Sequence, residues 1–264
     1  MPLEIFGQEK IEKPVFNSDK KKTKFVDLTS TATIRILTKE RLTINTHFIN
    51  KSTVKCLGEN CPVCANNRNL IVQFPDSFRE EAHYSPKREV KMVNVLDRTP
   101  VRVCTADGTE NRNSMSCAKC GAILSGDPTP SNTVKVLSRG VTLFDSLDAI
   151  NNAIMDDKGE KVGITNYDVT LAVSGTGKNR ITTPIAGQIS PLAVDIAEDQ
   201  LFDLETVTIE LTPPEMIDLQ RGVSLKDIFA ARKATAKLSE DNPFVSQDLL
   251  DSARSDVEDL FRNA

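Results

Sequence analysis

The six cysteines of this 264-residue chain fall into two short stretches, and this grouping constrains the fold more than any other sequence feature. Three lie in CLGENCPVC, from Cys56 to Cys64, and three lie between Cys104 and Cys120, ending in CAKC. Each stretch holds a Cys-x-x-Cys pair, which presents two sulfurs on one tight turn at a spacing that suits a tetrahedral metal. A chain of this length can bury a core without disulfides. We therefore expect the cysteines to bind metal.

The rest of the sequence favours a structural metal site over a catalytic or redox one. A redox Cys-x-x-Cys pair opens a helix after a strand in a βαβ unit, and neither pair lies in that pattern. A catalytic zinc keeps an open position near a general base, but the chain has only two histidines and no His-Glu-x-x-His motif. The sequence predicts one or two structural Zn²⁺ ions and no enzymatic activity.

The sequence leaves two groupings of the ligands open. In the first, there are two local sites, one formed by His47, Cys56, Cys61 and Cys64 and the other by Cys104, Asp107, Cys117 and Cys120. In the second, a single ion is shared by Cys61, Cys64, Cys117 and Cys120. We slightly favour two local metal sites over one shared site because each group of ligands is compact in sequence. Asp107 is the weakest of these candidates, since its carboxylate replaces a thiolate, and His47 could instead face solvent from a strand.

No basic start followed by an apolar run marks a signal peptide, and no stretch approaches the about 18 apolar residues that cross a bilayer. We therefore expect a cytoplasmic protein without a membrane partner. Thiols stay reduced in that compartment, where clustered pairs bind metal more often than they form disulfides.

Outside the cysteine stretches, the chain is rich in β-branched residues. Such runs predict strands at 31–37, 42–49, 88–97, 101–104 and 132–137. Apolar side chains spaced three and four apart predict a helix at 140–154. Residues 167–185 predict a β-hairpin with the glycine-rich tip SGTGKN. Further helices are expected at 65–74, after Thr212 and after Ser224.

The order is two strands, an insertion, a strand, a second insertion, a strand, a helix and a hairpin. This order resembles that of the OB-fold, which has five strands with a helix before the last two. We therefore predict a mainly β protein with α-helices, built as an OB-fold-like five-stranded barrel with zinc-binding insertions and C-terminal helices. The expected parts are a basic N-terminal arm at 1–28, a core at 29–190 with insertions at about 50–70 and 103–125, a helical segment at 191–237 and an acidic flexible tail at 238–264.

Charge is distributed unevenly along the chain. Residues 1–190 carry 26 Lys and Arg against 21 Asp and Glu, whereas residues 191–264 carry 7 against 16. A basic body followed by an acidic end is typical of nucleic-acid-binding proteins with acidic tails, although chance variation explains such a difference about equally well. Residues 239–264 hold seven carboxylates and two arginines. Such a tail could cover a basic groove until DNA displaces it.

Four segments resemble a known family. THFINKSTVKCLGENCPVC, REVKMVNVLDRTPVRVC, CAKCGAIL and VKVLSRGVTLFDSLDAI, within about residues 30–185, are similar to the zinc-containing single-stranded-DNA-binding proteins of tailed phages, which include the helix-destabilising proteins of T-even phages. The order from His47 to Cys64 resembles the metal site of that family with different spacings. Other members carry a complete zinc ribbon where this chain has Cys104, Asp107, Cys117 and Cys120. Asp107 is the departure from that pattern, so the resemblance supports the second metal less strongly than the first.

The resemblance implies an OB-fold that binds and protects single-stranded DNA in phage replication or recombination, in the host cytoplasm and without strong sequence preference. It also implies replication or recombination partners recruited by the acidic tail, and self-association on DNA. Such binding requires cations for phosphates and flat rings for stacking. Candidate cations are Arg35, Lys39, Arg41, Lys51, Lys55, Lys87, Arg88, Lys91, Arg98, Lys135, Arg139, Lys178 and Arg180. Candidate rings are Phe48, Phe74, Tyr84 and Tyr167, although we expect Phe48 and Phe144 to be core.

Two other functions remain compatible with the sequence. A zinc-ribbon adaptor would bind other proteins and no nucleic acid. A primase or nuclease subunit would need clustered carboxylates for Mg²⁺, and Asp156 and Asp157, beside Gly159, are more simply turn residues. The DNA-binding interpretation is preferred because it accounts for the cysteines, the basic body and the acidic end together.

Overall fold

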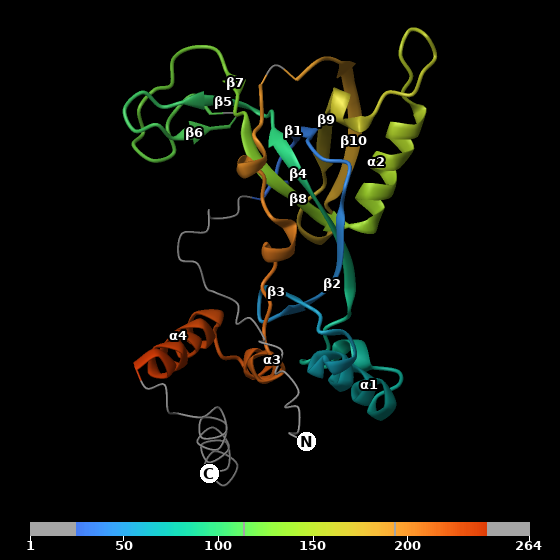
Figure 1. The fold of residues 1–264 in the computed structure, drawn as a ribbon, viewed down its shortest axis with the longest axis vertical. Coiled ribbons are helices and arrows are strands. Elements are labelled where there is room, and N and C mark those ends of the chain that lie inside the picture. The colour runs from blue at the N-terminus through green and yellow to red at the C-terminus, as the bar shows by residue number, and fades with distance from the viewer. Residues whose placement is uncertain (1–24, 113, 193, 242–264) are drawn as a thin grey trace, which may run out of the picture.

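The described residues, 25–112, 114–192 and 194–241, form one large antiparallel sheet with helices around it in the computed structural model (Figure 1). The strands of this seven-stranded sheet are β1 (Ala32–Ile36), β2 (Leu42–Ile49), β3 (Ser52–Lys55), β4 (Arg88–Asp97), β8 (Thr133–Gly140), β9 (Tyr167–Ser174) and β10 (Ile181–Ile189). The prediction of a mainly β protein with α-helices is confirmed.

Strand β4 is the centre of the sheet because it pairs with three others. β8 lies along one edge of β4, opposite residues 90–97. β1 and β2 share the other edge, β1 opposite residues 95–97 and β2 opposite residues 88–92. β9 pairs with β1 and β10, which gives the order β10-β9-β1-β4-β2-β3. Among the described residues no pairing joins β8 to β10, so the sheet is not closed into a barrel.

One face of the sheet is covered by helix α2 (Val141–Ala153). Leu143, Phe144 and Leu147 of α2 are buried against apolar side chains of β1, β4, β8 and β9. The three-and-four spacing of the sequence thus corresponds to the face that α2 buries. The other face is covered by the chain after β10, where the backbone N–H and C=O of Phe202 bond to the side chain of Asn94 at 3.0 and 2.9 Å.

Two insertions extend from the sheet toward opposite ends of its long axis (Figure 1). We call residues 47–87 the first module; it contains β3 and α1 (Pro62–Gln73). We call residues 100–130 the second module; its β5 (Pro100–Val103), β6 (Glu110–Asn111) and β7 (Thr129–Pro130) form a small sheet in the order β6-β5-β7. The C-terminal helices α3 (Pro213–Gln220) and α4 (Leu225–Asp241) pack against the first module.

Most predicted elements agree with the structure, with three differences. The run at 101–104 forms β5 of the second module and not a strand of the main sheet. β3 was missed, because its four residues give no periodicity. Helix α1 begins at Pro62, three residues earlier than predicted, because proline suits the first helical position.

The two chain ends lie largely outside the described residues. Residues 1–24 of the predicted arm and 242–264 of the predicted tail are not described. The last part of the predicted arm belongs to the core: Val26 and Leu28 are buried, and the Val26 N–H donates to the Val136 carbonyl at 3.0 Å.

Short 3₁₀ helices connect the main elements. They are η1 (Gly58–Asn60), η2 (Phe78–Glu80), η3 (Ile164–Asn166), η4 (Gly177–Asn179), η5 (Glu198–Gln200) and η6 (Leu204–Thr206). Within the described part of the chain, no helix has the length and apolarity needed to cross a membrane.

Candidate metal centres and nucleic-acid surface

His47, Cys56, Cys61 and Cys64 come together in the first module and form the first centre. His47 is on β2, Cys56 directly follows β3, and Cys61 and Cys64 lie at the start of α1. His47 Nε2 is 3.4 Å from Cys61 Sγ and 3.3 Å from Cys64 Sγ, and the sulfurs of Cys56 and Cys64 are 3.7 Å apart. Tetrahedral Zn²⁺ places sulfur ligands about 3.8 Å apart and sulfur and nitrogen about 3.6 Å apart, so these groups fit the ion.

His47 is held in the orientation that a metal ligand needs. Its Nδ1 lies 2.9 Å from the Ser85 carbonyl oxygen, and the ring is fully buried. Donation from Nδ1 leaves Nε2 free to bind metal, as in many zinc sites. The Asn67 side chain fixes Ser85 in turn, donating to its carbonyl at 2.6 Å and accepting from its N–H at 3.2 Å. Burial lowers the pKa of His47, which favours the neutral, ligand-competent imidazole.

The thiols of the first centre need a cation in order to ionise together. Burial works to raise the pKa of Cys61, but hydrogen bonds, including those from the N–H groups of Cys64 and Leu57, outweigh it and lower that pKa. The pKa of Cys64 is raised to about 12 by burial and by the neighbouring Cys56 and Cys61. A divalent metal would offset this repulsion and bind the thiolates.

Cys104, Asp107, Cys117 and Cys120 form the second centre, in the second module. The Sγ atoms of Cys104 and Cys120 are 3.6 Å apart, and Cys117 Sγ lies 3.5 Å from Asp107 Oδ2. The Thr109 N–H donates to Asp107 Oδ1 at 2.9 Å. Hydrogen bonds from Thr109 hold the pKa of Asp107 below its usual range, so the carboxylate is charged as a ligand must be.

The second centre consists of two turns of the same form. Cys104 to Gly108 and Cys117 to Gly121 each close with a hydrogen bond from the glycine N–H to the carbonyl of the first cysteine, at 2.8 and 2.9 Å. Both glycines have positive φ, 70° and 75°, which residues with a Cβ adopt only with strain. Asp107 therefore stands where the other turn has Cys120, which supports its assignment as the fourth ligand.

The structure separates the two groupings that the sequence left open. Cys61 and Cys64 lie with His47 and Cys56, and the second Cys-x-x-Cys pair lies with Cys104 and Asp107. All six cysteines and both non-cysteine candidates are used in two groups, so the single shared site is wrong. Each group offers four ligand atoms within 4.8 Å of one another. A complete set of four is typical of structural sites, whereas catalytic zinc usually has three protein ligands.

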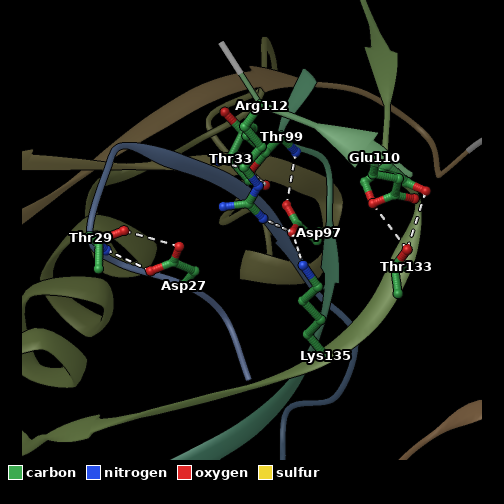
Figure 2. Close-up of polar contacts among 10 residues, drawn as sticks. Asp27, Thr29, Thr33, Asp97, Thr99, Glu110, Arg112, Thr133 and Lys135 are labelled. Carbon is green, nitrogen blue, oxygen red and sulfur yellow. Dashed lines mark hydrogen bonds and ion pairs between the residues drawn. The ribbon is translucent and has the colours of Figure 1, made fainter. Parts of the chain in front are cut away.

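The second module is fastened to the main sheet by buried charge (Figure 2). Asp97, at the end of β4, is fully buried and forms ion pairs with Arg112 of the second module and with Lys135 of β8, the latter at 2.5 Å. The residue next to Arg112, Asn111, accepts from the Ala118 N–H beside the ligand Cys117 at 2.9 Å. The turn that contains Cys117 and the buried carboxylate of Asp97 are thus connected through the adjacent residues Asn111 and Arg112.

Two of the predicted DNA-contacting residues are buried, and the structure assigns them other roles. Arg35 is 2% exposed, and its guanidinium binds Asp168 at 2.7 Å and the Ser190 carbonyl at 3.0 Å. It therefore joins β1, β9 and the chain after β10, and cannot reach a phosphate in this conformation. Tyr167 is fully buried under α2, so it cannot stack on a base. Sequence alternation places residues on faces but does not show which faces are covered.

Five further candidate cations are partly buried in ion pairs. The pairs are Arg41 with Asp148, Lys55 with Glu210, Lys91 with Asp145, Arg98 with Asp168 and Lys135 with Asp97. Lys135 is committed to the buried carboxylate of Asp97 and is a structural residue. The other four lie at the surface, where ion pairs contribute little and a phosphate can compete with the carboxylate.

The remaining candidates are exposed, and several converge. Lys39, Lys51, Lys87, Arg88, Arg139 and Arg180 are exposed, and the side chain of Lys178 is not described. Arg139 on β8, Lys91 on β4 and Thr43 on β2 lie directly across from one another in the sheet. Desolvation and the Arg180 cation lower the pKa of Arg139, while Asp27 acts in the opposite direction, so Arg180 at the hairpin tip adds positive charge in the neighbourhood of Arg139.

A cleft of about 240 Å³ adjoins this row at the first module. It is lined by Thr43, Ile44, Asn45, Lys55, Cys56, Gly58 and Lys87. Thr43 thus belongs to both the row and the cleft. The sequence analysis missed Thr43, Ile44 and Asn45, because no motif distinguishes a lining residue from any other strand residue.

The aromatic candidates differ in exposure. Phe48, expected in the core, is 53% exposed, because its side chain lies on the face of β2 opposite the buried His47 and Ile49. Phe74 is 41% exposed. Tyr84 packs edge-to-face on Phe78, with ring centroids 5.1 Å apart. Phe144 is fully buried, as expected.

Comparison with protein-family models and with curated proteins gives no match to this chain.

Proposed function

We propose that this protein is a non-catalytic single-stranded-DNA-binding protein that coats and protects exposed strands largely without regard to sequence. The observation that carries this proposal is that Lys91 and Arg139 lie across from each other on one row of the sheet, next to a cleft lined by Lys55 and Lys87, with the Arg180 cation close enough to Arg139 to affect its pKa. A phosphate backbone requires cations in line along a groove. Phe48 of the first module offers an exposed ring for base stacking.

The strand order supports an OB-fold for the main sheet. If β1 and β2 are counted as one interrupted strand and the short β3 of the first module is left out, five strands of the main sheet follow one another with α2 between the third and the fourth. That is the order of the OB-fold, which is often a partly open barrel. The absence of a β8–β10 pairing in the described residues makes this an open version.

We propose Zn²⁺ as the metal of both centres. Three thiolates with one imidazole, and three thiolates with one carboxylate, are donor sets that suit zinc. In each centre the protein supplies four ligands, so the ion would hold loops together and perform no chemistry. His47, Cys56, Cys61 and Cys64 would hold the first ion, and Cys104, Asp107, Cys117 and Cys120 the second.

The similarity of the four segments to phage proteins gives the proposal its biological setting. In that setting the protein would act in the host cytoplasm during replication or recombination. It would bind partner proteins through residues 238–264 and associate with further copies on DNA. The acidic end of the chain agrees with this arrangement.

One observation favours a protein-binding adaptor as a second candidate. Met115 and Ile123 of the second module are 63% and 86% exposed. Apolar side chains held outward on a rigid module are typical of protein contacts. An adaptor would show no salt-dependent affinity for nucleic acid.

The test is a fluorescence-anisotropy titration of labelled poly-dT over a salt series, with duplex DNA as control and the zinc content measured on the same stock. Tight binding that weakens steeply with salt supports the proposal. Replacing Arg139 and Arg180 by alanine should lower the salt slope by about 0.7 for each lost phosphate contact. The matched control is Lys226→Ala, an exposed lysine of α4. Absence of binding at low salt by folded, zinc-loaded protein would overturn the proposal.

A further inference from the structure

We infer that the metal of the first centre fastens the C-terminal helices to the protein, so that metal binding and helix docking stabilise each other. The inference rests on the proposed metal at this centre and not on DNA binding.

Helices α3 and α4 form one unit. Thr212 caps α3, donating from its N–H and its hydroxyl to Glu215 at 2.7 and 2.9 Å. Glu215 also binds Arg232 of α4 through two nitrogens, at 2.9 and 2.5 Å. The ion pair crosses the turn between the helices, so we expect them to dock or to detach together.

The apolar surface on which this unit docks is the metal module itself. The buried side chains Met216, Leu219 and Ile228 of the two helices share one cluster with Ile49, Val54, Cys61 and Val63. Two further ligands, Cys56 and Cys64, pack against the same cluster. Met216 and Leu219 are fully buried there. Three of the four metal ligands therefore belong to the surface that the helices cover.

The chain leading into α3 is attached to the same module. The Lys55 N–H, directly before the ligand Cys56, donates to the Ile209 carbonyl at 2.9 Å, and Val54 pairs with Ile209. Lys55 also forms an ion pair with Glu210 at 3.3 Å. Displacement of the segment around Cys56 would therefore disturb both the backbone and the side-chain contacts of residues 209–210.

The surface under the helices depends on the ion. Residues 56–61 form only a single 3₁₀ turn, and no disulfide joins the cysteines of the module. The sulfurs of Cys56 and Cys64 lie 3.7 Å apart, and those of Cys61 and Cys64 lie 3.4 and 3.3 Å from His47 Nε2, so an ion at this centre would tie residues 56–61 to β2 and α1. Loss of the metal would release this segment and remove the surface that Leu219 and Met216 contact. By thermodynamic linkage, detachment of the helices would lower the affinity of the first centre for the metal by the same factor.

The experiment uses the full chain with Cys117→Ser and Cys120→Ser, so that only the first centre binds zinc. Hydrogen exchange is compared with and without zinc. We expect the amides of α3 and α4 to exchange at least about tenfold faster without zinc, within the usual range of coupling between sites, while the amides of β4 and β8 keep their protection. Equal exchange of α3 and α4 in the two states would overturn the inference.

The reciprocal experiment measures zinc affinity by competition with a chromophoric chelator. Leu219→Asp should lower the affinity of the first centre by about tenfold or more, and the milder Leu219→Ala should lower it less. The matched control is Ile217→Asp on the same helix, because Ile217 is 37% exposed and lies outside the cluster. Unchanged zinc affinity in both Leu219 variants would overturn the coupling between zinc binding and helix docking, but not the proposed zinc site. Failure of the unsubstituted chain to bind zinc would overturn the proposed zinc site as well.

Discussion

The two metal modules have similar ligands but are fastened to the protein in different ways. In the first module the candidate ligands His47 and Cys61 are at most 1% exposed, and the surrounding contacts are apolar and include two C-terminal helices. In the second module Cys120 is exposed, and the attachment to the sheet is a buried ion pair between Arg112 and Asp97. Two similar sets of candidate ligands are therefore joined to the protein by an apolar core in one module and by a charged anchor in the other.

The largest expected effect is the decrease in stability caused by removing the metal of the first centre. We expect Cys61→Ser to lower the free energy of unfolding by about 4 kcal/mol or more, because metal loss is among the most destabilising changes in a protein. Chemical denaturation at fixed zinc concentration measures this. The matched variant Cys117→Ser, also a buried ligand, should cost less because the second core is small. Equal losses would remove the distinction between the modules.

The next effect concerns the charged anchor. Asp97→Asn should lower the free energy of unfolding by about 2–3 kcal/mol, because two cations lose a buried partner. Burial works to raise the pKa of Asp97, but its partners outweigh it, chiefly the hydrogen bonds from Lys135 and Thr99, and lower the pKa. The contribution of a carboxylate with a lowered pKa is present above its unfolded pKa of about 3.9 and is lost as pH falls below it. Chemical denaturation at pH 7 and at pH 3 should therefore show that acid lowers the free energy of unfolding less in Asp97→Asn than in the unsubstituted chain. An equal decrease in both proteins would contradict the role of this carboxylate.

A smaller effect is expected from changing Asp107, the candidate ligand whose type distinguishes the second centre from the first. Asp107→Cys should tighten zinc binding at the second centre, because thiolate is a softer ligand than carboxylate. Asp107→Ala should weaken it by about tenfold or more. Chelator competition in a chain with Cys61→Ser and Cys64→Ser isolates this centre. If Asp107→Ala retains full affinity, Asp107 is not a ligand.

The smallest effect tests which module lies near DNA. Lys87→Ala should lower the salt slope of poly-dT binding by about 0.7, as expected for one lost phosphate contact. Lys119 is also exposed and lies on the Cys117–Gly121 turn of the second module, and Lys119→Ala should leave the slope unchanged. The reverse result would place DNA at the second module.

The sequence by itself indicated most of the local elements and the candidate metal ligands. The spacing of Val141, Phe144 and Leu147 predicted α2, because helix periodicity follows from backbone geometry alone. The two Cys-x-x-Cys turns indicated half of the candidate ligands for a similar reason, since a tight turn brings nearby residues together whatever surrounds it.

Only the tertiary structure decided which residues of distant segments meet. Arg35 alternates on its strand as a surface residue would, but the chain after β10 covers it and Asp168 neutralises it. The docking of α3 on the metal module and the pairing of Arg112 with Asp97 join residues far apart in sequence. Such contacts depend on how elements pack, and no local pattern encodes packing.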